Sequence, residues 1–412
     1  MKFIYNCSVY IASFFIRIIA LFSPKIRLFV NGRKNVFSYL KNVIPNNSKM
    51  IWVHTASLGE FEQGLPVIEK LKIKHPDYKV LVTFFSPSGY EVKKNSKSAD
   101  FITYLPLDTK KNAERFIEIV NPKLVIFVKY EIWPNYLSTL KAKNIPTLLI
   151  SALFNKRQVF FKSYGAFMRN SLNAFSHFFV QDANSKKLLS SLQYNNASVN
   201  GDTRFDRVIE ILERDNHLDF IEKFKGNNLC FVAGSTWPED EAILVDYINT
   251  TNDALKFILA PHTIKADNVK KIAASINKKT LLYSDLKDQN LADFDVFIID
   301  TIGILTKVYS YANIAYVGGG FATGLHNTLE PAVFGIPVII GPQFSGFKEA
   351  EELVAQKGII SISDSMTFRN EMEKLLNSKE YYKQTSEINS KYISENKGAT
   401  DLIMNFIGSQ IL

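Results

Sequence analysis

The sequence predicts an α/β protein with two doubly wound units, each a parallel sheet covered by helices on both faces. Short apolar runs of strand type alternate with segments of helical periodicity from residue 49 onward. The alternation restarts near residue 229, and the two series are of similar length. Strands that alternate with helices pair in parallel, because each helix carries the chain back along the sheet. The predicted domains are 1–28, 29–203 and 204–412.

In the first series the apolar runs predict strands, and the segments between them have the spacing of amphipathic helices. The predicted strands are 50–53, 79–85, 101–105, 124–130, 147–152 and 177–181. The predicted helices are 61–74, 110–120, 136–143, 164–174 and 184–192. The segment 201–206, Gly-Asp-Thr-Arg-Phe-Asp, is the predicted junction between the two series.

In the second series the predicted strands are 229–233, 256–260, 280–283, 296–300, 314–317, 337–340 and 358–362. From about residue 367 the chain is helical in pattern and rich in Lys and Glu. Two doubly wound domains that face each other form a central cleft lined by the carboxyl ends of their strands. We therefore expect the functional residues at strand ends.

The composition is that of a globular protein with an anionic partner. The 412 residues are 46% hydrophobic and 22% charged, with a formal net charge of +9. Such a basic balance suits nucleic acid, a membrane surface or a phosphorylated substrate. Cys7 and Cys230 lie far apart in apolar runs, which predicts neither a disulfide nor a metal site.

The N-terminal segment predicts a membrane-associated helix. Residues 3–22 are apolar over a length that can span a bilayer. A polar stripe along the helix would instead let it lie in the interface; the stripe is Asn6, Tyr10, Ser13 and Arg17. Residues 1–50 contain Lys and Arg but no Asp or Glu, and this basic flank keeps the protein body on the cytoplasmic side in both arrangements. The alternative is the hydrophobic first helix of a soluble domain.

Glu60 lies in a turn between a predicted strand and a predicted helix. The strand at 50–53 is followed by small residues that include Ser57 and Gly59, and beyond Glu60 the apolar residues recur at helical spacing. Ligands bind at such carboxyl ends of parallel strands. A carboxylate at a helix start can also act only as a favourable charge for the helix dipole. Glu131 is a second strand-end carboxylate, and its alternative role is to satisfy helix N–H groups near Asn135.

Two segments of the second half predict phosphate contacts. Ser235 or Thr236, after the strand at 229–233, can cap the next helix, whose free N–H groups would hold a phosphate. The spacing is that of neither a P-loop nor a dinucleotide fingerprint. His262, at the end of the next strand, is either a structural histidine or a donor to a phosphate or sugar.

The glycine-rich segment 317–342 carries the strongest nucleotide signal. Glycines at 318–320 would let backbone amides approach a phosphate; they are Gly318, Gly319 and Gly320. A helix is predicted to start near Asn327, with Glu330 in its first turn. Glu330 would accept hydrogen bonds from ribose hydroxyls, or form a capping pair with Asn327, or do both.

Several of these segments together resemble a known enzyme family. They are Ser-Leu-Gly-Glu at 57–60, Glu-Ile-Trp-Pro-Asn at 131–135, the junction at 201–206, Gly-Ser-Thr at 234–236 and Gly-Leu-His-Asn-Thr-Leu-Glu at 324–330. In this order they are similar to the 3-deoxy-D-manno-octulosonic acid (Kdo) transferases, glycosyltransferases of GT-B fold. The resemblance covers nearly the whole chain. It implies an inverting transfer of Kdo from CMP-Kdo to a lipid A precursor, lipid IVA, at the cytoplasmic face of the inner membrane.

The resemblance also implies roles for individual residues. Glu60 would be the catalytic base and Glu131 a second catalytic carboxylate, with Ser57 and Gly59 at the acceptor. The donor would be held by Arg204, Ser235, Thr236, His262, Gly318, Gly319, Gly320, His326, Asn327 and Glu330. Residues 29–203 would be the acceptor-side domain, and 204–412 the CMP-sugar domain with the C-terminal helices. We expect no cofactor and no catalytic metal, since no Asp-x-Asp pair stands at a strand end near the nucleotide site.

Two other classes of function share part of these signals. A different GT-B transferase or an epimerase that uses a UDP-sugar would share the glycine-rich loop and Glu330, but need not have the segments around Glu60 and Glu131. A basic nucleic-acid-binding protein without catalysis would fit the charge, but the sequence has no recognisable binding motif for nucleic acid. We therefore expect no nucleic-acid partner.

Overall fold

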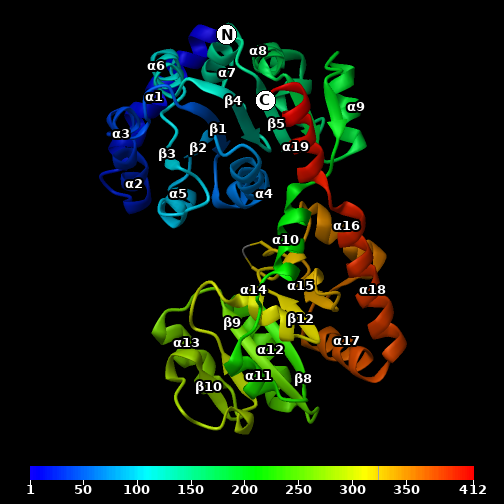
Figure 1. Ribbon diagram of the computed structural model, residues 1–412. Helices are drawn as coiled ribbons and strands as arrows, with labels where there is room; N and C mark the ends of the chain where they lie inside the picture. Colours follow the sequence, from blue (N-terminus) through cyan, green and yellow to red (C-terminus); the bar gives the residue numbers. More distant parts are fainter. Residues whose placement is uncertain (323) are drawn as a thin grey trace. The chain divides into compact units, whose positions relative to one another are not determined.

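A computed structural model describes residues 1–322 and 324–412, which form two compact units (Figure 1). The first unit contains Met1–Arg207 together with Lys397–Leu412, and the second contains Val208–Asn396. Helix α10 (Thr203–Glu213) begins in the first unit and ends in the second.

The first unit is built on a parallel sheet of seven strands in the order β3-β2-β1-β4-β5-β6-β7. The strands are β1 (Lys49–Thr55), β2 (Tyr78–Phe84), β3 (Phe101–Tyr104), β4 (Pro122–Val128), β5 (Thr147–Ala152), β6 (His177–Val180) and β7 (Ala197–Val199). Successive residues of a strand point to opposite faces. In β1, Met50 and Trp52 accordingly enter one core cluster, and Ile51 and Val53 enter another. The sheet is therefore buried on both faces, as expected for a doubly wound unit.

Helices follow the strands of the first unit in the expected alternation. They are α4 (Leu58–Lys74), α5 (Pro87–Lys93), α6 (Lys110–Val120), α7 (Pro134–Ala142), α8 (Ala166–Ser171) and α9 (Ala183–Ser191). Three helices precede the sheet: α1 (Lys2–Ile19), α2 (Pro24–Gly32) and α3 (Val36–Val43). Short 3-10 turns flank α8 at Val159–Phe161, Ser163–Gly165 and Leu172–Ala174.

The second unit has its own parallel sheet of seven strands, in the order β10-β11-β9-β8-β12-β13-β14. The strands are β8 (Leu229–Thr236), β9 (Leu255–Pro261), β10 (Thr280–Leu282), β11 (Val296–Ile298), β12 (Ile314–Val317), β13 (Val338–Ile340) and β14 (Ile359–Ser361). Its helices are α11 (Asp219–Lys225), α12 (Pro238–Thr250), α13 (Ala266–Ser275), α14 (Leu305–Val308), α15 (Leu329–Ala332), α16 (Lys348–Gln356), α17 (Ser365–Asn377) and α18 (Lys379–Asn396). Both predicted series of alternating strands and helices are confirmed.

The last helix, α19 (Ala399–Gln410), belongs to the first unit, whereas the sequence grouped it with the second domain. In Figure 1 this red helix lies among the elements of the first unit. Its Ile403, Met404 and Ile407 are buried in the core cluster of β1, β2 and β4. Asp206 accepts hydrogen bonds from the amides of Gly398 and Thr400, at 2.6 and 2.7 Å, and so holds the start of the helix. Hydrophobic burial therefore sets this assignment, which chain order does not reveal.

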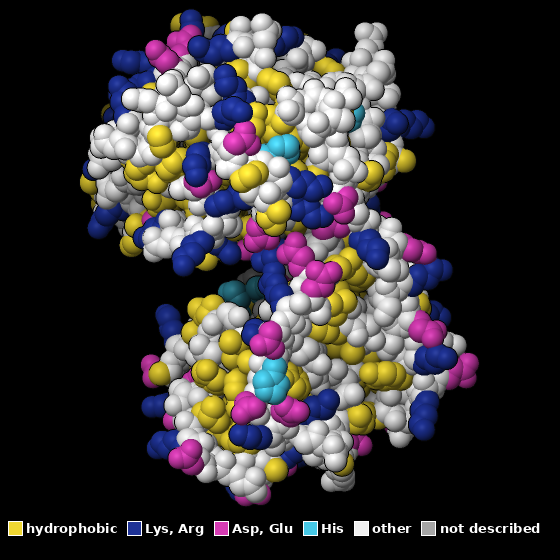
Figure 2. Space-filling model, in the orientation of Figure 1, with side chains coloured by type: hydrophobic (Ala, Val, Ile, Leu, Met, Phe, Trp, Pro, Cys, Tyr) yellow, Lys and Arg dark blue, Asp and Glu magenta, His cyan; other side chains and the backbone are white. Residues whose placement is uncertain are grey.

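Helix α1 is long and apolar enough to cross a membrane, and none of it is buried. Its polar stripe is only partly covered by the first unit. Asn6 accepts a hydrogen bond from Asn135 at 2.8 Å, and Tyr10, Ser13 and Arg17 line a cavity of about 700 Å³, although Tyr10 and Arg17 are themselves exposed. Its large apolar side chains are also exposed: Phe3, Ile4, Ile11, Phe14, Phe15, Ile18 and Ile19. Figure 2 shows hydrophobic side chains beside Lys and Arg on the left of the first unit, where α2 and α3 lie.

Candidate functional site

Glu60 lies where the sequence predicted it, in the turn between β1 and α4. Ser57 is the N-cap of α4, and Glu60 is the third residue of the helix. The Oε2 atom of Glu60 accepts hydrogen bonds from the amides of Ala56 and Ser57, at 2.5 and 3.3 Å. Glu60 therefore caps the helix with Ser57 in a capping box, a contact more specific than the dipole charge considered as its alternative role. Its Oε1 atom makes no hydrogen bond to any residue in the described part of the chain.

The electrostatic surroundings of Glu60 favour a proton acceptor that titrates near neutral pH. Burial raises the pKa of Glu60 to about 7, and the negative charge of Glu131 adds to the rise. The amides of Ala56 and Ser57 and the cation of Lys129 oppose it, with smaller effects. A general base works best when its pKa lies near the working pH. This carboxylate thus has both the position and the pKa of a base.

Glu131 follows β4 and is held by two side chains. Its Oε2 atom lies 2.8 Å from the indole nitrogen of Trp133 and 3.2 Å from Nε2 of His54. The Glu131 side chain is 13% exposed, and His54 is fully buried. The amides near Asn135 are satisfied by Asp108, which accepts from Asn135 N and Tyr136 N at 3.1 and 3.0 Å. The predicted alternative role of Glu131 as a cap for this helix is therefore wrong.

Arg204 lies in the first unit, although the sequence placed it in the donor domain. Its guanidinium binds the buried Asp202 through Nε and Nη2, both 2.9 Å from Oδ2. Asp202 also accepts from Gln63 of α4 at 2.7 Å. These contacts, with the Thr203 hydroxyl hydrogen-bonded to Ser151 and to the carbonyl of Gln63, fix the start of α10 to the first unit.

The first turn of α12 differs from the prediction, because neither Ser235 nor Thr236 caps it. Trp237 is the N-cap residue, and Asp240 accepts a hydrogen bond from the Trp237 amide at 2.9 Å. Thr236 instead donates to Glu241 at 3.1 Å. Ser235 has a positive φ of 55°. The fully buried Asp240 supplies the negative charge that the sequence assigned to a bound phosphate at this helix start.

The glycine-rich loop after β12 is packed against its own unit. The amide of Gly318 donates to the carbonyl of Gly234, and the amide of Gly319 donates to Asp240, both at 2.9 Å. A Cβ atom at Gly320 would lie 2.8 Å from the backbone of Gly341 in the loop after β13. Close approach of two backbone segments therefore explains the glycine at 320, and two of the three predicted phosphate-binding amides already have partners.

Three aromatic rings gather beside this loop. The ring of His262 stacks on Trp237, with centroids 4.5 Å apart and planes at 18°, and it lies 4.8 Å from the ring of His326. The indole nitrogen of Trp237 donates to Nε2 of His326 at 3.1 Å. Burial lowers the pKa of His326, and the nearby His262 lowers it further. His326 is therefore neutral at pH 7, with its proton on Nδ1.

Asn327 and Glu330 contact each other as the structural alternative predicted. The Asn327 amide donates to Oε1 of Glu330 at 3.1 Å, and Asn327 Oδ1 accepts from the amide of Leu329. The helix here is short, and α15 begins at Leu329. Glu330 also lies near Tyr309, where its charge adds to the effect of burial in raising the pKa of the phenol.

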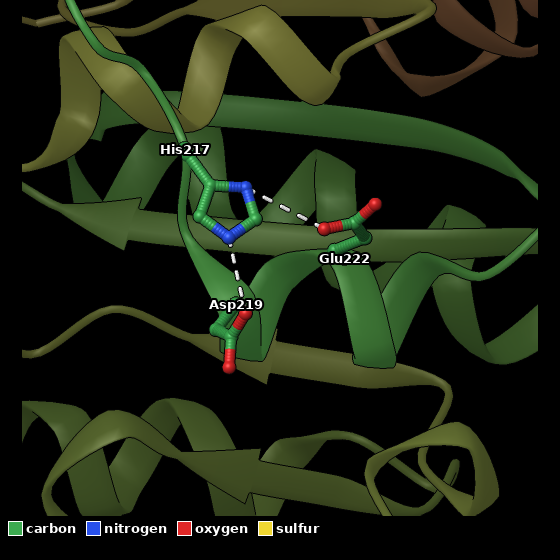
Figure 3. Close-up of side chains that lie close together, drawn as sticks. All are labelled: His217, Asp219 and Glu222. Atoms are coloured by element: carbon green, nitrogen blue, oxygen red, sulfur yellow. Dashed lines mark hydrogen bonds and ion pairs between the residues drawn. The ribbon is translucent and has the colours of Figure 1, made fainter.

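One group of side chains has the spacing of metal ligands, and Figure 3 shows it. His217 contacts Asp219 through Nε2 at 3.0 Å and Glu222 through Nδ1 at 3.5 Å. All three residues are exposed at the start of α11. Both ring nitrogens are directed at carboxylates, so the three side chains are hydrogen-bonded or paired with one another beside a helix N-terminus. It shares no residue with the carboxylates or loops described above.

Sequence reasoning missed His54, Trp133, Trp237 and Asp240. Each acts through a polar atom whose partner is distant in sequence or lies in a neighbouring loop. A usable signal existed for His54, because it is a polar residue at an inward position of an otherwise apolar strand. A buried polar side chain requires partners, and this requirement points to Thr83 and Glu131 only once the sheet order is known.

Residues 31–207 match the family model described as 3-deoxy-D-manno-octulosonic-acid transferase (kdotransferase). The chain is 29% identical to the 3-deoxy-D-manno-octulosonic acid transferase of Haemophilus influenzae over 412 residues, which covers 95% of this chain and 94% of that protein. It is 33% identical to the transferase of the same name from Aquifex aeolicus over 339 residues, covering 78% and 86%.

Among solved structures, the chain resembles the UDP-GlcNAc 2-epimerase from Neisseria meningitidis bound to UDP-GlcNAc. The TM-score is 0.63 at 17% identity, over 88% of this chain and 100% of that one. At such an identity the likeness concerns the fold alone. It agrees with the two parallel seven-stranded sheets and identifies the fold as the GT-B type.

Proposed function

The chain belongs to the family of 3-deoxy-D-manno-octulosonic acid (Kdo) transferases, and from this premise we propose that it transfers Kdo from CMP-Kdo to a lipid A precursor, lipid IVA. The reaction proposed is a single displacement with inversion. An acceptor hydroxyl oxygen bonds to the anomeric carbon as the bond from that carbon to the CMP phosphate breaks. The hydroxyl proton passes to a base on the protein, and CMP leaves with the electron pair of the broken bond.

The observation that carries this proposal is the state of Glu60. Its carboxylate stands at the carboxyl end of a central strand, with one oxygen held by two amides and with a pKa of about 7. The other oxygen is oriented by the cap and is available to take the acceptor proton. Gly59 supports the acceptor role of this turn, because a Cβ atom built there meets nothing within 4 Å. The fold itself therefore does not demand glycine at 59. Ser57 fixes the turn and completes the proposed acceptor site.

The donor is assigned to the second unit. Glu330 and Asn327 would bind the ribose hydroxyls, and His262 and His326 would contact the phosphate or sugar. Ser235, Thr236 and the loop of Gly318, Gly319 and Gly320 would surround the phosphate. Since the amides of Gly318 and Gly319 have internal partners, the phosphate contacts would come from side chains and from neighbouring amides. Arg204 would supply a cation to the donor.

Attachment to the cytoplasmic face of the inner membrane is proposed from helix α1. Its apolar side chains are exposed, and Asn6 of its polar stripe is hydrogen-bonded to the protein. A helix in this orientation buries its apolar face in the interface of the bilayer. The Lys and Arg residues of 1–50, without any Asp or Glu, would bind anionic headgroups.

The test is incubation of the detergent-solubilised protein with CMP-Kdo and lipid IVA, followed by mass spectrometry of the lipid. The expected result is a lipid heavier by whole Kdo residues and release of CMP. A parallel thermal-shift measurement with CMP and UDP tests the nucleotide, and stabilisation by CMP alone is expected. An unmodified lipid together with stabilisation by UDP would replace this proposal with a UDP-sugar enzyme of the same fold.

A further inference from the structure

A chain of hydrogen bonds runs through the core of the first unit to Glu131. The Trp52 indole nitrogen lies 2.7 Å from Oγ1 of Thr83, which lies 2.8 Å from Nδ1 of His54. His54 Nε2 lies 3.2 Å from Oε2 of Glu131, and Trp133 donates to the same oxygen. Trp52, His54 and Thr83 are completely buried. The chain therefore links the interior of the sheet to a carboxylate at its carboxyl edge.

The direction of each hydrogen bond follows from the chemistry of the groups. An indole N–H only donates, so Thr83 Oγ1 accepts from Trp52. Among the described residues the hydrogen of the Thr83 hydroxyl has one remaining acceptor, Nδ1 of His54. An imidazole that accepts at Nδ1 carries its proton on Nε2 and donates it to Glu131. The Trp133 indole nitrogen lies 3.1 Å from Nε2 and 2.8 Å from Oε2 of Glu131, and with Nε2 protonated it donates to the carboxylate only. The opposite tautomer would leave a buried hydroxyl hydrogen without a partner, at a cost of about 1–3 kcal/mol.

We propose that His54 is a positioning residue for the transfer reaction, and that with Thr83 it holds the Glu131 carboxylate oriented beside the catalytic base. This inference rests on the proposed function, in which Glu60 is that base. Two N–H donors on one oxygen fix the plane of the Glu131 carboxylate. Neither His54 nor Thr83 contacts substrate in this scheme, and both act through Glu131.

The charge of Glu131 matters because it acts on Glu60. The groups that face Glu60 are Glu131, whose charge raises its pKa, and Lys129 and the amides of Ala56 and Ser57, which lower it. Tyr130 of the same loop is also close enough to interact with Glu60. Because the negative charge of Glu131 raises the pKa of Glu60, the place in which His54 and Thr83 hold Glu131 affects the basicity of a residue that they do not touch.

The competing explanation is that His54 only fills the core. Its ring packs against Phe127 and Trp133, with centroids 5.6 and 6.1 Å away. Both explanations predict a loss of stability when a substitution removes one of these hydrogen bonds. Only the positioning role predicts a change in the pH at which Glu60 titrates, so that pH distinguishes the two.

The decisive variants are Thr83→Val and Thr83→Ser, a matched pair of which only the second keeps the hydroxyl. Without the hydroxyl, Nδ1 of His54 loses its donor, and the proton that Nε2 donates to Glu131 is no longer fixed there. A Glu131 carboxylate without this donor can turn away from its place beside Glu60. Its negative charge then raises the pKa of Glu60 less. The pKa of Glu60 therefore falls, and the acid limb of the activity profile moves to lower pH.

The experiment records kcat/KM against pH for Kdo transfer by the full-length protein, with thermal unfolding as a folding control. For Thr83→Val we expect a shift of the acid limb to lower pH and a plateau about tenfold lower, as for a lost hydrogen bond to a charged group. For Thr83→Ser we expect the acid limb at the same pH as in the wild-type protein. Trp133→Phe removes the other donor to Glu131 and should move the limb in the same direction, which decides the matter if Thr83→Val does not fold.

If Thr83→Val and Trp133→Phe are folded and the acid limb of their kcat/KM profiles lies at the wild-type pH, the positioning role is overturned. The titration of Glu60 can also be followed without turnover, by carbonyl ¹³C NMR with Glu60→Gln to assign the signal. A lower Glu60 pKa in the variants supports the network even in an assay without transfer. Absence of transfer by the wild-type protein would overturn the proposed function instead, so the two failures are distinct.

Discussion

Both units have polar turns after parallel strands, but the polar groups in these turns are hydrogen-bonded differently in the two units. In the first unit, Glu60 and Glu131 are each held through one oxygen, and the other oxygen of each makes no hydrogen bond within the described residues. In the second unit, Asp240 and the amides of Gly318 and Gly319 are hydrogen-bonded to groups of the same unit. A strand-end turn therefore predicts where a site lies, whereas the hydrogen-bond partners decide which of its groups remain available to a ligand.

The largest effect should come from the first unit, through Glu60→Gln. Glutamine keeps an oxygen for the amides of Ala56 and Ser57 but cannot accept the proton. Turnover should fall by about two to four orders of magnitude, the usual contribution of a general base. The dissociation constant for CMP should stay unchanged, because the nucleotide is assigned to the second unit. Near-normal turnover at saturating acceptor would reassign the base to Glu131.

The same variant has a predicted stability profile. The pKa of Glu60 is raised from 4.5 to about 7 in the folded protein, so the folded state favours the protonated form. The stability from this group is complete below pH 4.5 and is lost as the pH rises through 7. Glu60→Gln removes that dependence. Its Tm relative to the wild type should be higher at pH 8 than at pH 5.

Helix α1 of the first unit should give the next largest effect, if it is the membrane anchor as proposed. Phe14→Ser with Phe15→Ser removes two exposed rings from the apolar face of α1. Each buried ring contributes about 1.5–3 kcal/mol, so the partition coefficient onto anionic liposomes should fall by at least tenfold, measured by flotation. CMP binding should not change. Equal partitioning of the variant and the wild type would remove α1 as the anchor.

The second unit is tested through Glu330. If its carboxylate binds the ribose, Glu330→Ala should weaken CMP binding by about 10- to 100-fold, the equivalent of a lost hydrogen bond to a charged group. The matched control is Glu330→Gln, which keeps an oxygen that can accept from Asn327 but removes the charge. Wild-type affinity in Glu330→Gln together with a loss in Glu330→Ala would indicate that Glu330 serves the loop and not the ribose. Calorimetry with CMP measures both.

Two glycines give the smallest effects and the sharpest contrast between the units. Gly320→Ala places a Cβ atom 2.8 Å from Gly341 and should destabilise the protein by about 1–3 kcal/mol. Gly59→Ala meets open space inside a helix, where alanine is favoured by about 1 kcal/mol, so its Tm should hold or rise. Its KM for the acceptor should rise nonetheless. A Gly59→Ala protein with wild-type kinetics would remove Gly59 from the acceptor site.

Most of the fold could be predicted from the sequence, because apolar runs identify buried strands. Strand β7 was missed since Ala197–Val199 has no such run and pairs only at the edge of the sheet. The helix predicted at 164–174 is broken by 3-10 turns on both sides of α8. Gly165 lies there, and a Cβ atom at this position would strike the carbonyl of Val159.

The candidate site was predicted less completely than the fold. Glu60 could be located because the apolar period changes around it, from that of a strand to that of a helix. The partners of Glu131 could not, because His54 and Glu131 are separated by 77 residues and meet only through the pairing of β1 with β4. Asp240 was overlooked because an acidic residue in a first helical turn is ordinary. Its contact with the amide of Gly319 depends on the order of β8 and β12 in the sheet.

The return of α19 to the first unit has a consequence for how the protein is made. The ribosome synthesises the strands of the first unit at the outset, yet the core of β1, β2 and β4 lacks Ile403, Met404 and Ile407 until the last residues emerge. The second unit, continuous from 208 to 396, is complete before the first is closed. A premature stop after residue 396 would therefore damage the half of the protein that was translated first.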